Sequence, residues 1–293
     1  MARKLDVILT AIAPAIWGSS YLITTEMLPA GYPLTVAMLR ALPAGLLLLL
    51  LVRQLPKGGW WLKVFILGAL NFSVFWWLLF EAAYRLPGGV AATVGAIQPL
   101  IVIFIARMLL GSAIRGIAVI AAVTGIGGVA LLTLSQSAAL DPVGIIAGLV
   151  GALSMGCGTV LSRHWQPPVS LLTFTAWQLT AGGILLLPAA FLLEPALPSL
   201  TNTNLLGFAY LGLIGAAITY VLWFRGISKL EPSVVSSLGF LSPVMAVTLG
   251  WLVLNQSLGV SQILAIAIVL TSVWLSQKKI KFSLHSPLAT LIK

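Results

Sequence analysis

Long, nearly uncharged apolar segments dominate this chain and leave few folds open to it. Of its 293 residues, 60% are hydrophobic and only 8% are charged, whereas roughly a quarter of the residues in a soluble globular domain are charged. Runs such as 44–52 and 97–110 are apolar on nearly every side and lack the alternation of barrel strands. Because bare backbone groups are costly in hydrocarbon, such runs are expected to be membrane-spanning helices. The chain is therefore predicted to be an all-α integral membrane protein.

Turn-forming residues divide the chain into ten segments of about 20 residues, a length that crosses about 30 Å of hydrocarbon. Breaks fall at Gly- and Pro-containing stretches such as 29–31, 56–59 and 87–89. The predicted spans are residues 6–26, 33–52, 62–84, 88–110, 114–134, 142–164, 169–193, 205–228, 232–254 and 258–277. They form two predicted domains of five spans each, 1–137 and 138–279, followed by a cytoplasmic tail at 280–293.

The basic residues predict the direction of the chain in the membrane. An even number of spans places both termini on one side, and Lys and Arg collect on the cytoplasmic side. With the termini inside, Arg85 is the one basic residue at the outer end of a span, and Arg40 lies within the second span. The first span follows Arg3 and Lys4 as in a signal peptide, but Trp17 and the polar stretch 19–25 favour a retained helix. Both termini are therefore predicted to be cytoplasmic.

An internal repeat relates the two predicted domains. A shift of 138 residues places Gly18 on Gly156, Arg40 on Gln178 and Gly45 on Gly183. A shift of 144 aligns Phe80 with Phe224 and the Gly-x-x-x-Pro pattern at 95–99 with the same pattern at 239–243. Because each unit has five spans, the second begins on the opposite face and is inverted. Secondary transporters with this architecture bind substrate near the midplane, where the repeats meet.

Three sequence features resemble the EamA repeat of the drug/metabolite transporter superfamily. They are the segment Ala-Ile-Trp-Gly-Ser-Ser-Tyr at 15–21, the lone Arg40 in the second span, and Val90 to Pro99 leading into a Pro-Leu-Ile-Val run. The resemblance covers residues 6 to about 277, and is greatest to bacterial amino-acid exporters of the YddG type. It implies a basket-like fold in which spans one to four and six to nine line a central cavity, while spans five and ten support it from outside.

Arg40 is the basic residue expected deep in a span, where a charge is costly and is usually tolerated only beside a cavity or a partner. It either neutralises the carboxylate of a substrate or ties the second span to a neighbouring helix, through backbone carbonyls or Gln98. The sequence leaves both roles open.

Glu81 and Arg85 stand four residues apart near the outer end of the third span. This spacing favours an i,i+4 ion pair on the helix surface. The alternative is a proton-coupling carboxylate or an outer-mouth pair, which requires a buried acid with a raised pKa. The other acidic residues are expected at helix ends or in loops, so facilitated export is favoured over strong proton coupling.

Aromatic and polar residues in the spans that the resemblance assigns to the cavity complete the candidate site. Aromatic rings suit apolar and aromatic substrates, and polar groups in a span need partners. The candidate substrate-binding set is Trp17, Tyr21, Arg40, Asn71, Trp77, Gln98, Trp177, Gln178, Tyr220 and Ser237. Pro14, Pro99 and Pro243 are hinge candidates, because proline interrupts the hydrogen bonds of a helix.

These features together predict an inner-membrane exporter of aromatic and other neutral amino acids and related metabolites, working by alternating access. A multidrug or organic-cation exporter is the first alternative. A polytopic membrane enzyme is disfavoured, because no catalytic residue set is evident in the spans. No cofactor, metal or nucleic-acid partner is expected. The expected partners are membrane lipid and small-molecule substrates, and the expected assembly is a monomer or weak dimer.

Overall fold

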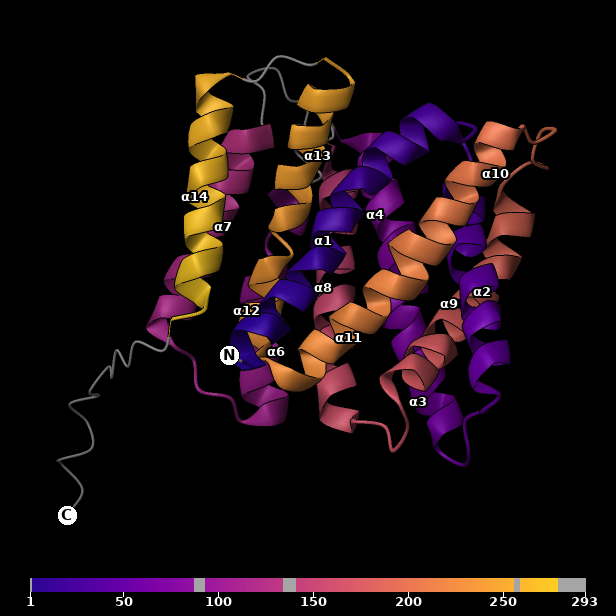
Figure 1. Ribbon diagram of the computed structural model, residues 1–293, viewed down its shortest axis with the longest axis horizontal. Coiled ribbons are helices and arrows are strands. Elements are labelled where there is room, and N and C mark those ends of the chain that lie inside the picture. Colours follow the sequence, from indigo (N-terminus) through magenta and orange to yellow (C-terminus); the bar gives the residue numbers. More distant parts are fainter. Residues whose placement is uncertain (1, 87–92, 134–140, 256–258, 279–293) are drawn as a thin grey trace.

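The computed structural model describes residues 2–86, 93–133, 141–255 and 259–278, and the regular elements in these ranges are all helices (Figure 1). The elements are α1 (Ala2–Met27), α2 (Pro33–Val52), α3 (Trp60–Gly68), η1 (Ala69–Ser73), α4 (Val74–Arg85), α6 (Gln98–Leu110), α7 (Gly116–Thr133), α8 (Pro142–Trp165), α9 (Leu171–Leu193), α10 (Asn202–Ala209), η2 (Tyr210–Ile218), α11 (Thr219–Lys229), α12 (Pro232–Leu238), α13 (Leu241–Val253) and α14 (Val260–Ser276). The all-α prediction is confirmed.

Eight helical stretches in the described residues are long and apolar enough to cross a membrane. They coincide with the predicted spans one to four and six to nine, although residues 88–92 of the fourth lie outside the described residues. Two shorter apolar helices, Gly116–Leu132 and Val260–Ser276, lie where the fifth and tenth spans are predicted. The protein is thus a multi-pass membrane protein with eight candidate spans, and the count of ten remains a prediction.

Two of the long spans contain π-helical turns. The third is made of α3, η1 and α4, and the eighth of α10, η2 and α11. A π-turn is wider than an α-turn and shifts backbone carbonyls away from their usual partners, and such turns often lie at functional sites. The shift of 144 residues that relates the two halves of the sequence carries η1 into η2.

Two other spans are broken at a proline. In the fourth, a turn at residues 96–97 precedes α6, which has Pro99 in its first turn. In the ninth, α12 ends at Leu238 and α13 begins at Leu241, just before Pro243. Each break lies within a Gly-x-x-x-Pro pattern. Proline has no N–H to donate to the preceding turn, which favours a break there. Pro14, by contrast, lies inside the continuous helix α1.

Helices from the two halves pack against each other in corresponding pairs. The most extensive contacts join α2 to α9 and α7 to α14. In addition, α1 lies on α11 and α13, while α8 lies on α4 and α6. Figure 1 shows α7 and α14 together at one edge of the molecule and α2 and α9 toward the other. The most extensive packing of the core is therefore between the halves.

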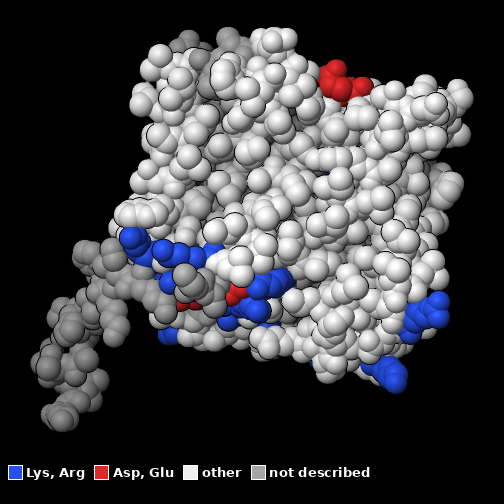
Figure 2. Space-filling model, viewed as in Figure 1, with Lys and Arg blue, Asp and Glu red and all other residues white. Residues whose placement is uncertain are grey.

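Lys and Arg side chains gather at the end of the molecule where α1 begins, as Figure 2 shows. At this basic end, Arg225 of α11 forms an ion pair with Asp6 of α1 at 2.6 Å. Arg163 of α8 donates to the carbonyl oxygens of Ile227 and Leu230 at the end of α11. A cation at a helix C-terminus satisfies carbonyls that lack helical partners.

Candidate functional site

A cluster of aromatic rings fills the space between α1, α4, α9 and α11. Tyr220 lies at its centre, with ring centroids 4.6 Å from Phe72, 4.9 Å from Trp17 and 6.2 Å from Trp76. We call the following residues the central aromatic cluster: Trp17, Phe72, Trp76, Phe174, Tyr220, Trp223 and Phe224. Tyr220 is 2% exposed and Phe72 is fully buried. The rings therefore pack on each other in this structure, and any molecule that enters the cluster has to replace some of these contacts.

Arg40 of α2 lies at the edge of the central aromatic cluster. Its Nη2 donates to the carbonyl oxygen of Gly215 in η2 at 2.7 Å. Its guanidinium carbon is 4.7 Å from the ring centroid of Trp76, which is a cation–π geometry. We call this arrangement of Arg40, Gly215 and Trp76 the charged contact.

A short hydrogen-bonded chain joins the charged contact to α1. The hydroxyl of Thr219 donates to the same Gly215 carbonyl at 2.9 Å and accepts from the indole Nε1 of Trp17 at 3.0 Å. The π-helical backbone of η2 thus presents one carbonyl oxygen to two side chains from different helices. Trp17 in turn lies on Tyr220, so a continuous set of contacts connects Arg40 to the rings through η2.

A second polar contact joins α9 to η1. The Nδ2 of Asn71 donates to the Oε1 of Gln178 at 2.8 Å and to the hydroxyl of Ser162 at 3.2 Å. We call this pair of Asn71 and Gln178 the neutral contact. Both side chains are buried, and the Oδ1 of Asn71 and the Nε2 of Gln178 have no partner among the described residues. Exchanging the amide atoms still leaves one donor and one acceptor for a ligand or solvent.

Several predicted site residues lie outside the central aromatic cluster. The role of Trp77 stays a prediction: its side chain is 47% exposed and lies outside the central aromatic cluster, whereas its neighbour Trp76 is buried and faces Arg40. Trp177 is buried, but its Nε1 donates to the carbonyl of Gln54 at 2.6 Å and its ring packs on Trp60. Among the described residues, ring contacts link it to the cluster through Trp60, which lies on Phe174.

The remaining candidates are placed as follows. Ser237 donates to the carbonyl of Ser233 within α12, so its hydroxyl is occupied locally. Gln98 begins α6, and its Nε2 has no partner among the described residues. Glu81 and Arg85 form the i,i+4 ion pair at 2.5 Å, and both are more than a third exposed. The side chain of Tyr21 lies outside the described residues.

Trp76 is the main residue that the sequence analysis missed. A signal was available, because the shift of 144 residues places Trp76 on Tyr220, and the two rings lie together in the cluster. The spacing of four residues between Phe72 and Trp76, and again between Tyr220 and Phe224, also places each pair on one helix face. The carbonyl of Gly215 gave no signal, because it depends on the π-helical turn of η2.

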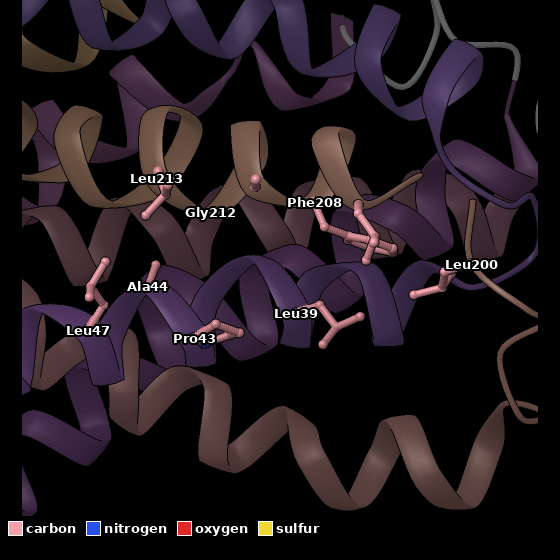
Figure 3. Close-up of a pocket in the computed structure, with 10 residues that line it drawn as sticks. Leu39, Pro43, Ala44, Leu47, Leu200, Phe208, Gly212 and Leu213 are labelled. Atoms are coloured by element: carbon pink, nitrogen blue, oxygen red, sulfur yellow. The ribbon is translucent and has the colours of Figure 1, made fainter. Parts of the chain in front are cut away.

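A groove of about 300 Å³ lies beside the charged contact, between α2 and the α10–η2 segment (Figure 3). Its walls are apolar, and include Leu39, Pro43 and Ala44 of α2 and Phe208 and Leu213 of the eighth span. None of the predicted site residues lines it. This apolar groove is therefore not the candidate site.

A search of protein-family models matches this chain to the one described as the EamA-like transporter family, at residues 4–134 and 142–277. The chain is 44% identical to Protein PecM of Dickeya dadantii over 273 residues, which is 92% of each chain. It is 30% identical to the uncharacterized inner membrane transporter YedA of Escherichia coli K12, covering 88% of this chain and 86% of that protein.

A solved crystal structure of a protein has the same fold. Its TM-score is 0.82 with 19% sequence identity, and the alignment covers 94% of this chain and 96% of the other. At this identity the likeness concerns the fold alone.

Proposed function

This chain belongs to the EamA-like transporter family, and we propose that it exports small metabolites across a bacterial inner membrane, with aromatic and other neutral amino acids as the first candidate substrates. The proposal places it with the exporters of the YddG type. The family match covers both halves of the chain.

The observation that carries the proposal is the charged contact beside the central aromatic cluster. A guanidinium can bind a carboxylate through two parallel hydrogen bonds. The rings of Trp17, Phe72 and Tyr220 offer stacking surfaces for an aromatic or apolar side chain. A carboxylate group attached to such a side chain matches both features at once.

The proposed architecture has ten spans in two inverted repeats. Four structural correspondences support it: η1 with η2, the proline breaks of the fourth and ninth spans, and the pairings of α2 with α9 and of α7 with α14. In this proposal substrate binds where the repeats meet, as in other transporters built from inverted repeats. Bending of the fourth and ninth spans at Pro99 and Pro243 opens the site to alternate sides.

The proposed orientation places the basic end in the cytoplasm, because Lys and Arg favour that side. We propose facilitated export without proton coupling. Glu81, the candidate for proton coupling, pairs with Arg85 at the helix surface and lies outside the central aromatic cluster.

The test is efflux from proteoliposomes that are loaded with a mixture of labelled amino acids. We expect saturable efflux of large neutral amino acids, with the same rate with and without a pH gradient. Arg40→Ala and Trp17→Ala should each abolish the saturable component. Trp61→Ala is the matched control, since Trp61 is 46% exposed near the start of α3 and should transport normally.

Failure of folded wild-type protein to release any amino acid would remove this substrate assignment. Efflux that survives in both Arg40→Ala and Trp17→Ala would instead remove the proposed site. Empty liposomes give the rate of passive leakage.

A further inference from the structure

Every carboxylate side chain of this protein is placed away from the central aromatic cluster. The chain has six Asp and Glu residues, and all six belong to its described part. Asp6 pairs with Arg225, Glu81 with Arg85 and Glu231 with Arg115, while Asp141 caps α8, Glu194 accepts from the first amides of α2, and Glu26 lies exposed near the end of α1. The charge at the cluster is therefore that of the Arg40 guanidinium.

This distribution matters for the ammonium group of a substrate. An ammonium is desolvated when it enters a buried site, and it needs a carboxylate or several carbonyl oxygens in compensation. At the cluster it would instead meet a guanidinium of the same charge. The nearby Gly215 carbonyl already accepts from Arg40 and Thr219, and the face of Trp76 already holds the guanidinium.

The neutral contact does not supply an anion either. Asn71 and Gln178 are amides, and Ser162 contributes a hydroxyl. These groups can orient a polar substituent, but they cannot balance a positive charge. Within the described residues, the polar groups near the rings favour a negative ligand over a positive one.

We propose that the site selects aromatic organic anions, which carry a carboxylate or sulfonate on an aromatic body and no ammonium. The anionic group lies on Arg40, and the aromatic body takes the place of ring contacts between Trp17, Phe72 and Tyr220. An aromatic amino acid is then a weaker substrate than its analogue without the amino group. This proposal rests on the proposed function, since it assumes that the cluster binds the transported molecule.

A matched ligand series tests the charge preference directly. Phenylalanine, 3-phenylpropionate and 2-phenylethylamine share one side chain and differ in having both charged groups, only the carboxylate, or only the ammonium. Binding to the purified protein in detergent is followed by tryptophan fluorescence. We expect 3-phenylpropionate to bind about tenfold more tightly than phenylalanine, with the amine weakest, because a charge-assisted pair with Arg40 is gained without a buried ammonium.

Variants then assign the preference to one residue. Arg40→Gln should bind 3-phenylpropionate no better than the neutral 3-phenylpropionamide, while Arg40→Lys keeps the order of the series. Arg107→Gln is the control, because Arg107 is exposed near the end of α6 and bonds to the carbonyl of Gly111. The permanently charged 2-phenylethanesulfonate, which does not leak through lipid, extends the measurement to efflux from vesicles.

The outcomes separate this inference from the proposed function. Tighter binding of phenylalanine or of the amine, or equal binding of all three, overturns the charge preference and leaves an exporter of aromatic compounds standing. If none of the three binds to folded wild-type protein, the cluster is not the substrate site and both proposals fall. The wild-type series decides the question even if Arg40→Gln does not fold.

Discussion

The charged contact and the neutral contact occupy corresponding places in the two halves of the molecule, yet they differ in chemistry. In each, a polar side chain of one helix of the α2–α9 pair reaches a π-helical segment in the other half: Arg40 reaches η2, and Gln178 reaches η1. One contact places a guanidinium on a backbone carbonyl and an indole ring, whereas the other joins two amides. The geometry that the two contacts share holds the two halves together, whereas the charge, which only the Arg40 contact has, is the feature that we assign to binding.

Trp76→Ala should break the charged contact with the largest effect. Trp76 is buried and carries both the cation–π contact with Arg40 and ring contacts with Phe72 and Tyr220. Truncating a buried tryptophan typically lowers the free energy of unfolding by about 3–5 kcal/mol. Thermal unfolding in detergent measures the loss. Trp77→Ala, next in the chain and half-exposed, should change it by less than about 1 kcal/mol, and equal losses would contradict the assigned direction of the two rings.

Gly45→Ala and Gly183→Ala test whether α2 and α9 contribute equally to the packing between the two halves. A side chain at Gly45 would meet the backbone of Thr180, and one at Gly183 would lie 2.6 Å from the Cα of Leu42. Each substitution should force α2 and α9 apart and cost about 1–3 kcal/mol, as overpacking does. Gly212→Ala is the control, since its nearest neighbour is 3.7 Å away. A loss of stability in only one of these two variants would show that the two halves are not equivalent where α2 packs on α9.

The neutral contact should behave as a structural pair. Gln178→Met removes the shorter of the two hydrogen bonds of the buried Asn71 amide, leaves it with Ser162, and should lower stability by about 1–3 kcal/mol. The double variant Asn71→Leu/Gln178→Met should lose less than the sum of the single changes, with a coupling of about 0.5–3 kcal/mol. Transport by Gln178→Met, once corrected for the amount of folded protein, should persist, whereas Arg40→Gln should abolish it. Loss of transport in folded Gln178→Met would assign binding to both contacts.

The smallest effect is expected at the ends of two other helix pairs, α1 with α11 and α8 with α4. At the basic end, α1 meets α11 through the Asp6–Arg225 ion pair, whereas at the other end Gly144 of α8 packs on Leu86 just beyond α4. Asp6→Asn should cost only about 0.2–1 kcal/mol, because the amide oxygen of asparagine can still accept from Arg225 and both side chains keep some contact with solvent. The cost should shrink in high salt, and the charge-swapped Asp6→Arg/Arg225→Asp should recover part of it. A salt-independent loss would point to packing instead of charge.

The span limits follow closely from the sequence because the bilayer sets helix length and excludes bare backbone groups. The predicted second span, 33–52, is α2 itself, and the predicted sixth, 142–164, differs from α8 by one residue. Asp141 lies at a helix end, as expected for the acidic residues other than Glu81, and accepts from the amide of Gly144. These features are local, so a single sequence contains them.

The direction of each side chain around its helix was less predictable. In α4 the aromatic residues of 75–80 lie on several sides, and both lipid and protein accept such rings. Apolar periodicity therefore did not distinguish Trp76 from Trp77. The π-helical turns add to the difficulty, because an extra residue per turn rotates everything that follows relative to a regular helix. Placement of Arg40 near Trp76 required the tertiary structure.

The hydrogen bond from Arg40 to Gly215 also bears on how the protein is made. Its two residues are 175 positions apart in the chain. At about 5–20 residues per second of synthesis, the carbonyl that accepts the hydrogen bond from Arg40 leaves the ribosome about 10–35 s after α2 does. During that interval a lone arginine in a nascent helix is expensive to hold in lipid. Biogenesis of this protein is therefore expected to depend on keeping α2 near the insertion machinery, so that Arg40→Leu should speed membrane integration of truncated chains even though it removes the charge from the finished protein.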